Sequence, residues 1–217
     1  MPIFIDHKKK NIFVTSYKCA FSTLFSLFKK HYGLSYSERI FSSKHAEFQD
    51  YIYDLTSYTD YKVNTICRNP YKRLVSGFLG RTVPLRPGKI TFGDFVKELL
   101  LKNDDVHFTN QCNYLLTNAI NNNFIDISNL DVIMENEYDE IIYENTTNYD
   151  KNNESCMCDA TTEDLFMMAN YPKYEYFYNS NIICDVNYLY SEDFKYFKNI
   201  GIIYMEPNYN KKQYIKA

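Results

Sequence analysis

The sequence contains no tryptophan, little glycine or proline, and no long apolar run. Its 217 residues include 6 glycines and 6 prolines, whereas 22 tyrosines and 16 phenylalanines must supply the aromatic core. No apolar run approaches the roughly 20 residues that cross a bilayer as a helix, so we expect no membrane span. The N-terminus is apolar and then basic, which is the reverse of a secretory signal peptide.

A strong excess of charge and a metal-binding cysteine pattern are absent as well. The formal net charge of −3 at pH 7 provides no electrostatic basis for binding nucleic acid or an anionic membrane. The cysteines are scattered except for Cys156 and Cys158, and no suitable pair of further metal ligands lies near these two. The pattern predicts reduced thiols, no metal and a cytoplasmic protein.

The first informative segment is residues 12–28. Residues 12–15 are apolar and rich in β-formers, which predicts a buried strand, and the apolar residues of 24–28 recur at helical spacing. The first amides of a helix lack intrahelical partners, and the helix dipole favours an anion there. With the hydroxyls of Ser22 and Thr23 and the cation of Lys18, this loop is a candidate phosphate site. An ordinary strand–helix connection with a surface lysine is the alternative.

The second informative segment is residues 61–81. Residues 63–67 predict a short strand, and Asn69 and Pro70 are favoured at the N-cap and first position of a helix. Arg68 therefore follows a strand, and Ser76 lies on the face of the helix near that strand end. Ligands of open α/β sheets bind at the carboxyl ends of strands. Two such junctions side by side would hold two phosphate groups of one nucleotide.

These two segments carry a resemblance to a known family. Residues 17–23, YKCAFST, and residues 67–76, CRNPYKRLVS, resemble the two cofactor motifs of the sulfotransferases. The similarity is greatest to the Golgi-type carbohydrate branch, which includes the heparan 2-O-, chondroitin and dermatan enzymes. It implies a P-loop-like fold and 3′-phosphoadenosine 5′-phosphosulfate (PAPS) as co-substrate, without a metal. It also implies a hydroxyl acceptor, which in this branch of the family is a glycan, and a tyrosine, a lipid or a small metabolite stays open.

The resemblance assigns roles residue by residue. Lys18 corresponds to the catalytic lysine, and Arg68 and Ser76 correspond to the residues that bind the 3′-phosphate. Phe21 departs from the family, in which a small residue is usual, so we expect its side chain to point away from the phosphate. The residues that correspond to the family's 5′-phosphosulfate site are Lys18, Cys19, Ala20, Phe21, Ser22 and Thr23.

The acceptor hydroxyl needs a general base, and two residues are candidates. His107 is the first, because a neutral imidazole takes a proton near pH 7 and its segment resembles a His-containing family segment. Glu135 is the rival, because residues 132–134 predict a strand and a family strand of this kind ends near the active site. A structural histidine and a solvated acidic turn are the alternatives.

The pattern as a whole predicts one α/β domain over residues 1–217. We expect a central, mainly parallel sheet of roughly four or five strands flanked by helices. Helices are expected to begin at Ser35, Thr91 and Thr161, each followed by an acidic residue at capping-box spacing. One helix is expected to end at Gly33, and residues 145–160 are expected to form a loop.

Two other classes of function remain open. A nucleotide kinase or other P-loop phosphotransferase would share the fold, but the first loop lacks its Gly-Lys-Ser/Thr sequence. A non-catalytic nucleotide- or glycan-binding protein would keep Arg68 and Ser76 without needing Lys18.

Overall fold

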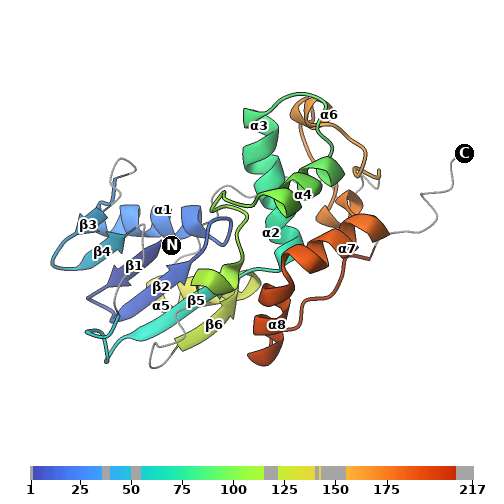
Figure 1. Ribbon diagram of the computed structural model, residues 1–217. Helices are drawn as coiled ribbons and strands as arrows, with labels where there is room; N and C mark the ends of the chain where they lie inside the picture. The colour runs from blue at the N-terminus through green and yellow to red at the C-terminus, as the bar shows by residue number, and fades with distance from the viewer. Residues whose placement is uncertain are drawn as a thin grey trace, which may run out of the picture. The chain divides into compact units, whose positions relative to one another are not determined.

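The computed structural model describes residues 2–35, 40–49, 55–114, 122–139, 142 and 155–208. The chain divides into two compact units, each made of two segments that are distant in sequence (Figure 1). We call Met1–Arg68 with Gln111–Thr146 the sheet unit, and Asn69–Asn110 with Thr147–Ala217 the helical unit. The single domain over residues 1–217 stays a prediction.

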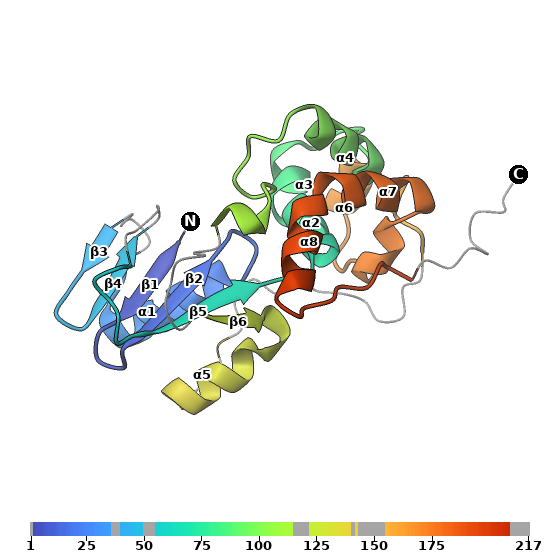
Figure 2. The ribbon, with the colours of Figure 1, turned by 60° about the horizontal axis from the view of Figure 1, so that its bottom comes forward.

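The sheet unit contains one mixed sheet, which has six strands in the described part of the chain (Figure 2). The strands are β1 (Ile3–Asp6), β2 (Asn11–Thr15), β3 (Ile40–Ser42), β4 (Ala46–Gln49), β5 (Lys62–Cys67) and β6 (Asn122–Asp126). Their order across the sheet is β3-β4-β1-β2-β5-β6. The strands β2, β5 and β6 run in parallel, so their carboxyl ends meet at one edge.

The predicted α/β class is confirmed, but the prediction of a mainly parallel sheet is wrong. The pairs β1–β2, β1–β4 and β3–β4 are antiparallel. Residues 7–10 and 43–45 are short connections, and strands joined by so few residues pair antiparallel because a parallel crossover needs a dozen or more. The crossovers occur only between β2 and β5 and between β5 and β6 among the described elements.

Two helices, α1 (Phe21–Tyr32) and α5 (Leu130–Tyr138), pack on the same face of the sheet. Strand alternation places Phe4, Phe13 and Ile66 on this face. The opposite face carries a smaller apolar cluster that the segment around Tyr58 and Tyr61 covers in part. The helices bury Leu24, Phe25, Leu27, Phe28, Leu130, Met134 and Tyr138.

Residues 132–134, which the sequence predicts as a strand, belong to helix α5. Leu130, Met134 and Tyr138 are its buried residues, and their spacing of four is helical. The segment is helical because these three apolar residues at helical spacing pack against the core, and the short apolar run of residues 132–134 does not form a strand. The third parallel strand is instead β6, an Asn-rich segment that the sequence analysis does not identify.

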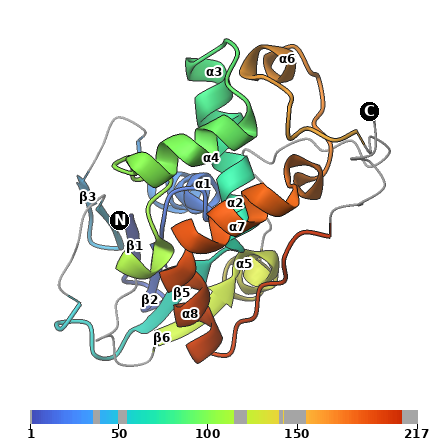
Figure 3. The same ribbon diagram turned by 45° about the vertical axis from the view of Figure 1, so that its right-hand side comes forward.

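The helices of the helical unit, drawn in Figure 3, pack around an aromatic core. Phe92 lies at its centre, with ring contacts to Phe78, Phe177 and Tyr178. Its helical elements are α2 (Pro70–Gly77), the π-helical η1 (Phe78–Thr82), α3 (Val83–Leu85), α4 (Phe92–Leu101), α6 (Thr162–Phe166), the 3₁₀ turn η4 (Tyr174–Phe177), α7 (Ser180–Leu189) and α8 (Ser191–Asn199).

Most of the predicted helix ends are confirmed. Asn69 accepts a hydrogen bond from the Tyr71 amide at the start of α2, and capping boxes begin α4 at Thr91 and α6 at Thr161. Gly33 ends α1 with a left-handed φ of 77°. The helix start expected at Ser35 falls mostly on residues 36–39, and the expected loop mostly on 145–154, and both ranges lie outside the described residues.

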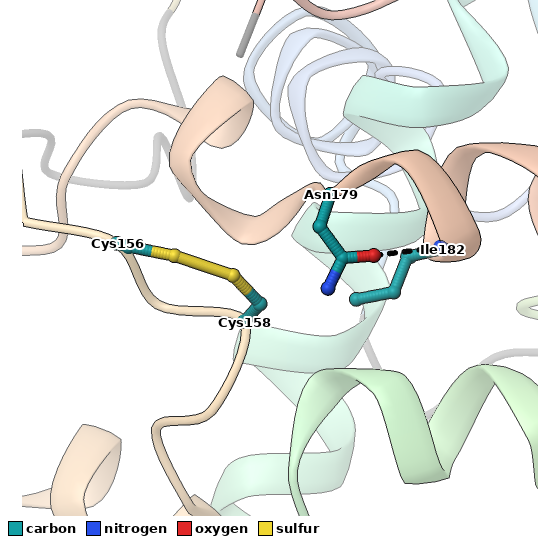
Figure 4. The surroundings of a disulfide bond; sticks show 4 residues. All are labelled: Cys156, Cys158, Asn179 and Ile182. Carbon is teal, nitrogen blue, oxygen red and sulfur yellow. Dashed lines mark hydrogen bonds between the residues drawn. A yellow bond between two sulfur atoms is a disulfide. The ribbon is translucent and has the colours of Figure 1, made fainter. Parts of the chain in front are cut away.

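The prediction of reduced thiols is wrong for one pair. Cys156 and Cys158 form a disulfide in a segment without helix or strand (Figure 4). Nearby, Asn179 caps α7 by accepting a hydrogen bond of 2.9 Å from the Ile182 amide. The described cysteines outside the disulfide are Cys19, Cys67, Cys112 and Cys184.

None of the helices in the described ranges combines the length and apolar character that a membrane crossing requires.

Candidate functional site

The loop between β2 and α1 has an unusual backbone. Lys18 and Ala20 have φ angles of 67° and 65°, whereas Cys19 between them is not among the described residues with positive φ. A left-handed conformation costs a non-glycine residue roughly 1 kcal/mol, so surrounding contacts must hold it. The Cys19 amide donates to the Ser16 carbonyl at 3.1 Å, and the Thr15 hydroxyl donates to the Cys19 carbonyl.

This alternation of backbone handedness resembles that of an anion-binding nest, in which successive amide groups turn toward a common point. The Cys19 amide, however, donates to the Ser16 carbonyl, so it is not one of the amides that face an anion here. Helix α1 begins directly afterwards, and its N-cap, Ala20, makes no side-chain capping hydrogen bond in the described structure. The first turn of α1 also contains no acidic residue. The helix dipole and the positive charge of Lys18 therefore favour an anion near this turn.

The side chain of Phe21 lies on the core side of this loop. Its ring centroid is 5.9 Å from that of Phe4, 5.8 Å from Phe25 and 6.2 Å from Phe48. These rings belong to the core under α1. The bulk of Phe21 is therefore accommodated in the core, as expected for a large residue in this position.

Arg68 connects the neighbouring strand to this loop. It follows β5, which pairs in parallel with β2, so the two strand ends that the sequence analysis singles out lie at the same sheet edge. The Arg68 Nη1 donates a hydrogen bond of 2.7 Å to the carbonyl oxygen of Lys18. The structure thus brings Lys18 and Arg68 together within the sheet unit.

A third residue of this site, Gln111, has no role in the sequence prediction. It begins the 3₁₀ turn η2 (Gln111–Tyr114) and is 2% exposed. Its Oε1 accepts hydrogen bonds from the Arg68 amide at 3.0 Å and from the Cys19 thiol at 3.1 Å, and its Nε2 donates to the Arg68 carbonyl at 2.8 Å. No local pattern marks Gln111, because its partners are distant in sequence.

Ser22 and Thr23 lie in the first turn of α1 in the sheet unit, whereas Ser76 and the first candidate base, His107, lie in the helical unit. Ser76 is partly exposed on α2, one turn after Arg73, which is buried and donates from Nη1 to the Thr109 carbonyl at 2.7 Å. The structure describes Ser76 and His107 within this unit, separately from Lys18 and Arg68. Their roles stay predictions.

His107 is held in a network of charged side chains. Its Nδ1 lies 2.7 Å from Oδ1 of Asp105, and Arg81 donates from Nε to Oδ2 of the same carboxylate at 2.7 Å. Burial alone would raise the pKa of Asp105, but hydrogen bonds from the His107 amide, Arg81 and the His107 ring lower this pKa to about 2. A carboxylate that stays ionised favours the imidazole tautomer with the proton on Nδ1. That tautomer makes Nε2 the basic nitrogen.

The segment that carries His107 is fixed at its end by packing. A Cβ atom on Gly77 would lie 2.4 Å from Cε1 of Phe108, so only glycine allows this ring to pack so closely on α2. The Phe108 carbonyl accepts hydrogen bonds from Asn103 and from the hydroxyl of Tyr190, at 3.0 and 2.8 Å.

Glu135 occupies a different setting from the one that the sequence predicts. It is exposed in the middle of α5 and does not follow a strand. The structural reason for choosing it as a base is therefore wrong, and its role as a base stays a prediction without support from the fold.

The donor set at the loop is made of amides, hydroxyls and cations, which suits an anion. The described residues contain no group of three or more His, Cys, Asp or Glu side chains that could hold a metal ion.

Comparisons of the chain with protein-family models, with curated proteins and with solved structures found no significant match.

Proposed function

We propose that this protein is a PAPS-dependent sulfotransferase that transfers a sulfuryl group to an acceptor hydroxyl, with a carbohydrate as the first acceptor class to test. The loop of residues 18–23 would bind the 5′-phosphosulfate, and Arg68 would bind the 3′-phosphate. Ser76 and His107 take the roles that the family resemblance implies. The P-loop-like fold belongs to this proposal, and so does the cytoplasmic location, which now rests on the four described cysteines outside the disulfide.

One observation supports the proposal most directly. Lys18 and Ala20 adopt left-handed backbone angles at the start of an uncapped helix, and Arg68 from the neighbouring strand contacts the same loop. Two cationic side chains at one carboxyl sheet edge suit a ligand with two phosphate groups. ADP also has two phosphates, but both extend from the 5′ carbon, so a preference for the 3′,5′-bisphosphate over ADP distinguishes the proposed ligand from ADP.

The proposed reaction is an in-line displacement at sulfur. The acceptor oxygen forms a bond to sulfur while the bond between sulfur and the bridging oxygen of PAPS breaks. The acceptor proton passes to the base, for which His107 is the first candidate, and adenosine 3′,5′-bisphosphate leaves. Negative charge grows on the bridging oxygen, and the Lys18 ammonium would stabilise it.

Two measurements on the full chain test this function. Calorimetry should show adenosine 3′,5′-bisphosphate binding about ten- to a hundredfold more tightly than ADP, which is the discrimination that a charge-assisted contact to the 3′-phosphate provides. Transfer of labelled sulfate from PAPS should then be screened over glycans, small alcohols and tyrosine peptides. Equal affinity for ADP would contradict the 3′-site, and tight bisphosphate binding without transfer to any acceptor would indicate a nucleotide-binding protein.

A further inference from the structure

Gln111 pairs with the backbone of Arg68 as a neighbouring strand would. Its side-chain amide accepts from the Arg68 N–H at 3.0 Å and donates to the Arg68 carbonyl at 2.8 Å. These two contacts also fix the orientation of the amide, because the flipped amide would set N–H against N–H and carbonyl against carbonyl. Gln111 therefore holds the backbone of the residue that follows β5.

The same amide oxygen reaches the loop after β2. The Cys19 thiol donates to Oε1 of Gln111 at 3.1 Å, and the Ser16 hydroxyl donates to the Cys19 sulfur at 3.1 Å. Cys19 is buried and stands between the two left-handed residues, Lys18 and Ala20. A shift of the loop backbone would therefore move the thiol relative to Gln111.

The network is buried, so its hydrogen bonds are costly to break. Gln111 and Cys19 are 2% and 0% exposed. A buried polar group that loses its hydrogen-bond partner costs far more free energy than an exposed one. An arrangement in which only one of the two segments has moved away from Gln111 is therefore unfavourable. The two segments that contact Gln111 are thus expected to adopt their ordered geometry together.

We propose that Gln111 is a positioning residue that couples the two phosphate-binding segments, so that a phosphate on the loop of residues 18–23 favours the Arg68 conformation that binds the second phosphate. This inference rests on the proposed donor site. It assigns to Gln111 a role that neither cofactor motif contains. It also gives a role to a buried amide that contacts both segments, beyond the parallel pairing of β2 with β5.

The coupling is measured with four ligands: adenosine, 5′-AMP, 3′-AMP and adenosine 3′,5′-bisphosphate. The coupling factor is the affinity for the bisphosphate multiplied by that for adenosine and divided by the product of the two AMP affinities. Wild type is compared with Gln111→Met, which keeps the side-chain volume and removes the amide. We expect the factor to fall about tenfold in Gln111→Met. Gln49→Met, at a partly buried glutamine on β4, should leave the factor unchanged.

The outcomes separate this inference from the proposed function. Wild type that does not bind the bisphosphate overturns the donor site and the inference with it. Wild type that binds all phosphate ligands, with an unchanged factor in Gln111→Met, overturns the inference and leaves the donor site standing. Should Gln111→Met fail to fold, Cys19→Ala replaces it, since it cuts the link to the loop while keeping the pairing with Arg68. An unchanged factor in Cys19→Ala would then overturn the coupling through this amide.

Discussion

The Arg68 guanidinium donates from Nη1 to the carbonyl oxygen of Lys18 at 2.7 Å, across a sequence separation of 50 residues. The side chain that follows β5 thereby holds the loop that follows the neighbouring parallel strand, β2. A guanidinium carries five N–H donors in a planar fork that matches a phosphate, which is why arginine is common in phosphate sites. The contact places this group against the loop that the proposal assigns to the 5′-phosphosulfate.

Arg68→Ala is expected to weaken the binding of adenosine 3′,5′-bisphosphate by at least about 1.5–3 kcal/mol, which is the contribution of a charge-assisted hydrogen bond. Because the loop also loses its contact, 5′-AMP should bind more weakly as well. Calorimetry measures both ligands. Arg86→Ala is the matched control, since Arg86 is exposed and pairs with Glu98 in the helical unit. Unchanged affinity for both ligands would contradict the assignment of Arg68.

Lys18→Ala should lower turnover much more than it lowers the affinity for the product, adenosine 3′,5′-bisphosphate. The charge that Lys18 would stabilise develops only during transfer, and such interactions act on the chemical step. Lys18→Arg should not restore the full rate, because a planar guanidinium cannot replace a compact ammonium at the bridging oxygen. Steady-state kinetics with an accepted acceptor measures this. Near-normal turnover of Lys18→Ala would leave the lysine as a binding charge only.

Local signals in the sequence were sufficient for the elements that build the candidate site. The apolar run of β2, the helical spacing in α1 and the Asn69–Pro70 pair each depend on near neighbours in the chain. The predicted proximity of the two strand ends is confirmed, because β2 and β5 pair in parallel. These features are predictable since strand alternation and capping are properties of short segments.

The remaining features depend on distant contacts or on exceptions to local rules. Gln111 is 92 residues from Cys19 and 43 from Arg68, so no spacing in the sequence marks it. The connection of β3 to β4 uses Ser43, Lys44 and His45, which lack the glycine or Asn-Gly signal of a tight hairpin.

The candidate phosphate loop, residues 18–23, is an exception of this kind. Its lack of glycine distinguishes it from a Walker A motif, yet Ala20 and Lys18 still adopt left-handed angles. Tertiary contacts can stabilise such a conformation without glycine, at a cost to folding. Sequence rules that associate a left-handed angle with glycine therefore do not find it.

Ala20→Gly is expected to leave the free energy of unfolding unchanged or to raise it by up to about 1 kcal/mol. Glycine removes the strain of a φ of 65°, and this gain offsets its larger chain entropy in the unfolded state. Ala20→Val should destabilise by about 1 kcal/mol or more, because a β-branched residue fits this conformation poorly. Urea unfolding measures both, with the buried β4 residue Ala46 as control: Ala46→Gly should destabilise. Loss of stability in Ala20→Gly equal to that in Ala46→Gly would contradict the strained geometry.

Tyr138→Phe is expected to destabilise the protein by about 1.5–3 kcal/mol, the contribution of a hydrogen bond to a charged group. Its hydroxyl donates to Oδ2 of the buried Asp6 at 2.8 Å, and Tyr32 donates to the same atom at 2.6 Å. Burial, followed by the nearby negative charge of Asp6, raises the pKa of Tyr138, so the hydroxyl keeps its proton. Chemical denaturation measures the loss. Tyr188→Phe is the control, since Tyr188 is 78% exposed and should unfold as wild type does.

The contact between Asp105 and His107 predicts a change in both stability and the pH profile when the carboxylate is removed. The pKa of Asp105 is lowered to about 2, so its stabilising effect is present above the ordinary carboxyl pKa of about 4 and is lost as the pH falls through about 2. The group is partly exposed, so solvent screening limits this effect to about 1 kcal/mol. Asp105→Asn should remove it, which acid denaturation at several pH values detects.

If His107 is the base, turnover rises with pH as the imidazole loses its proton. Asp105→Asn removes the negative charge beside the imidazolium, so this limb should move to lower pH while turnover falls. Asp104→Asn is the matched control, because the adjacent Asp104 is exposed and pairs with Lys102. His107→Ala should abolish the limb and leave bisphosphate affinity intact. An unmoved limb in Asp105→Asn together with a lower melting temperature would show that the pair only stabilises the fold.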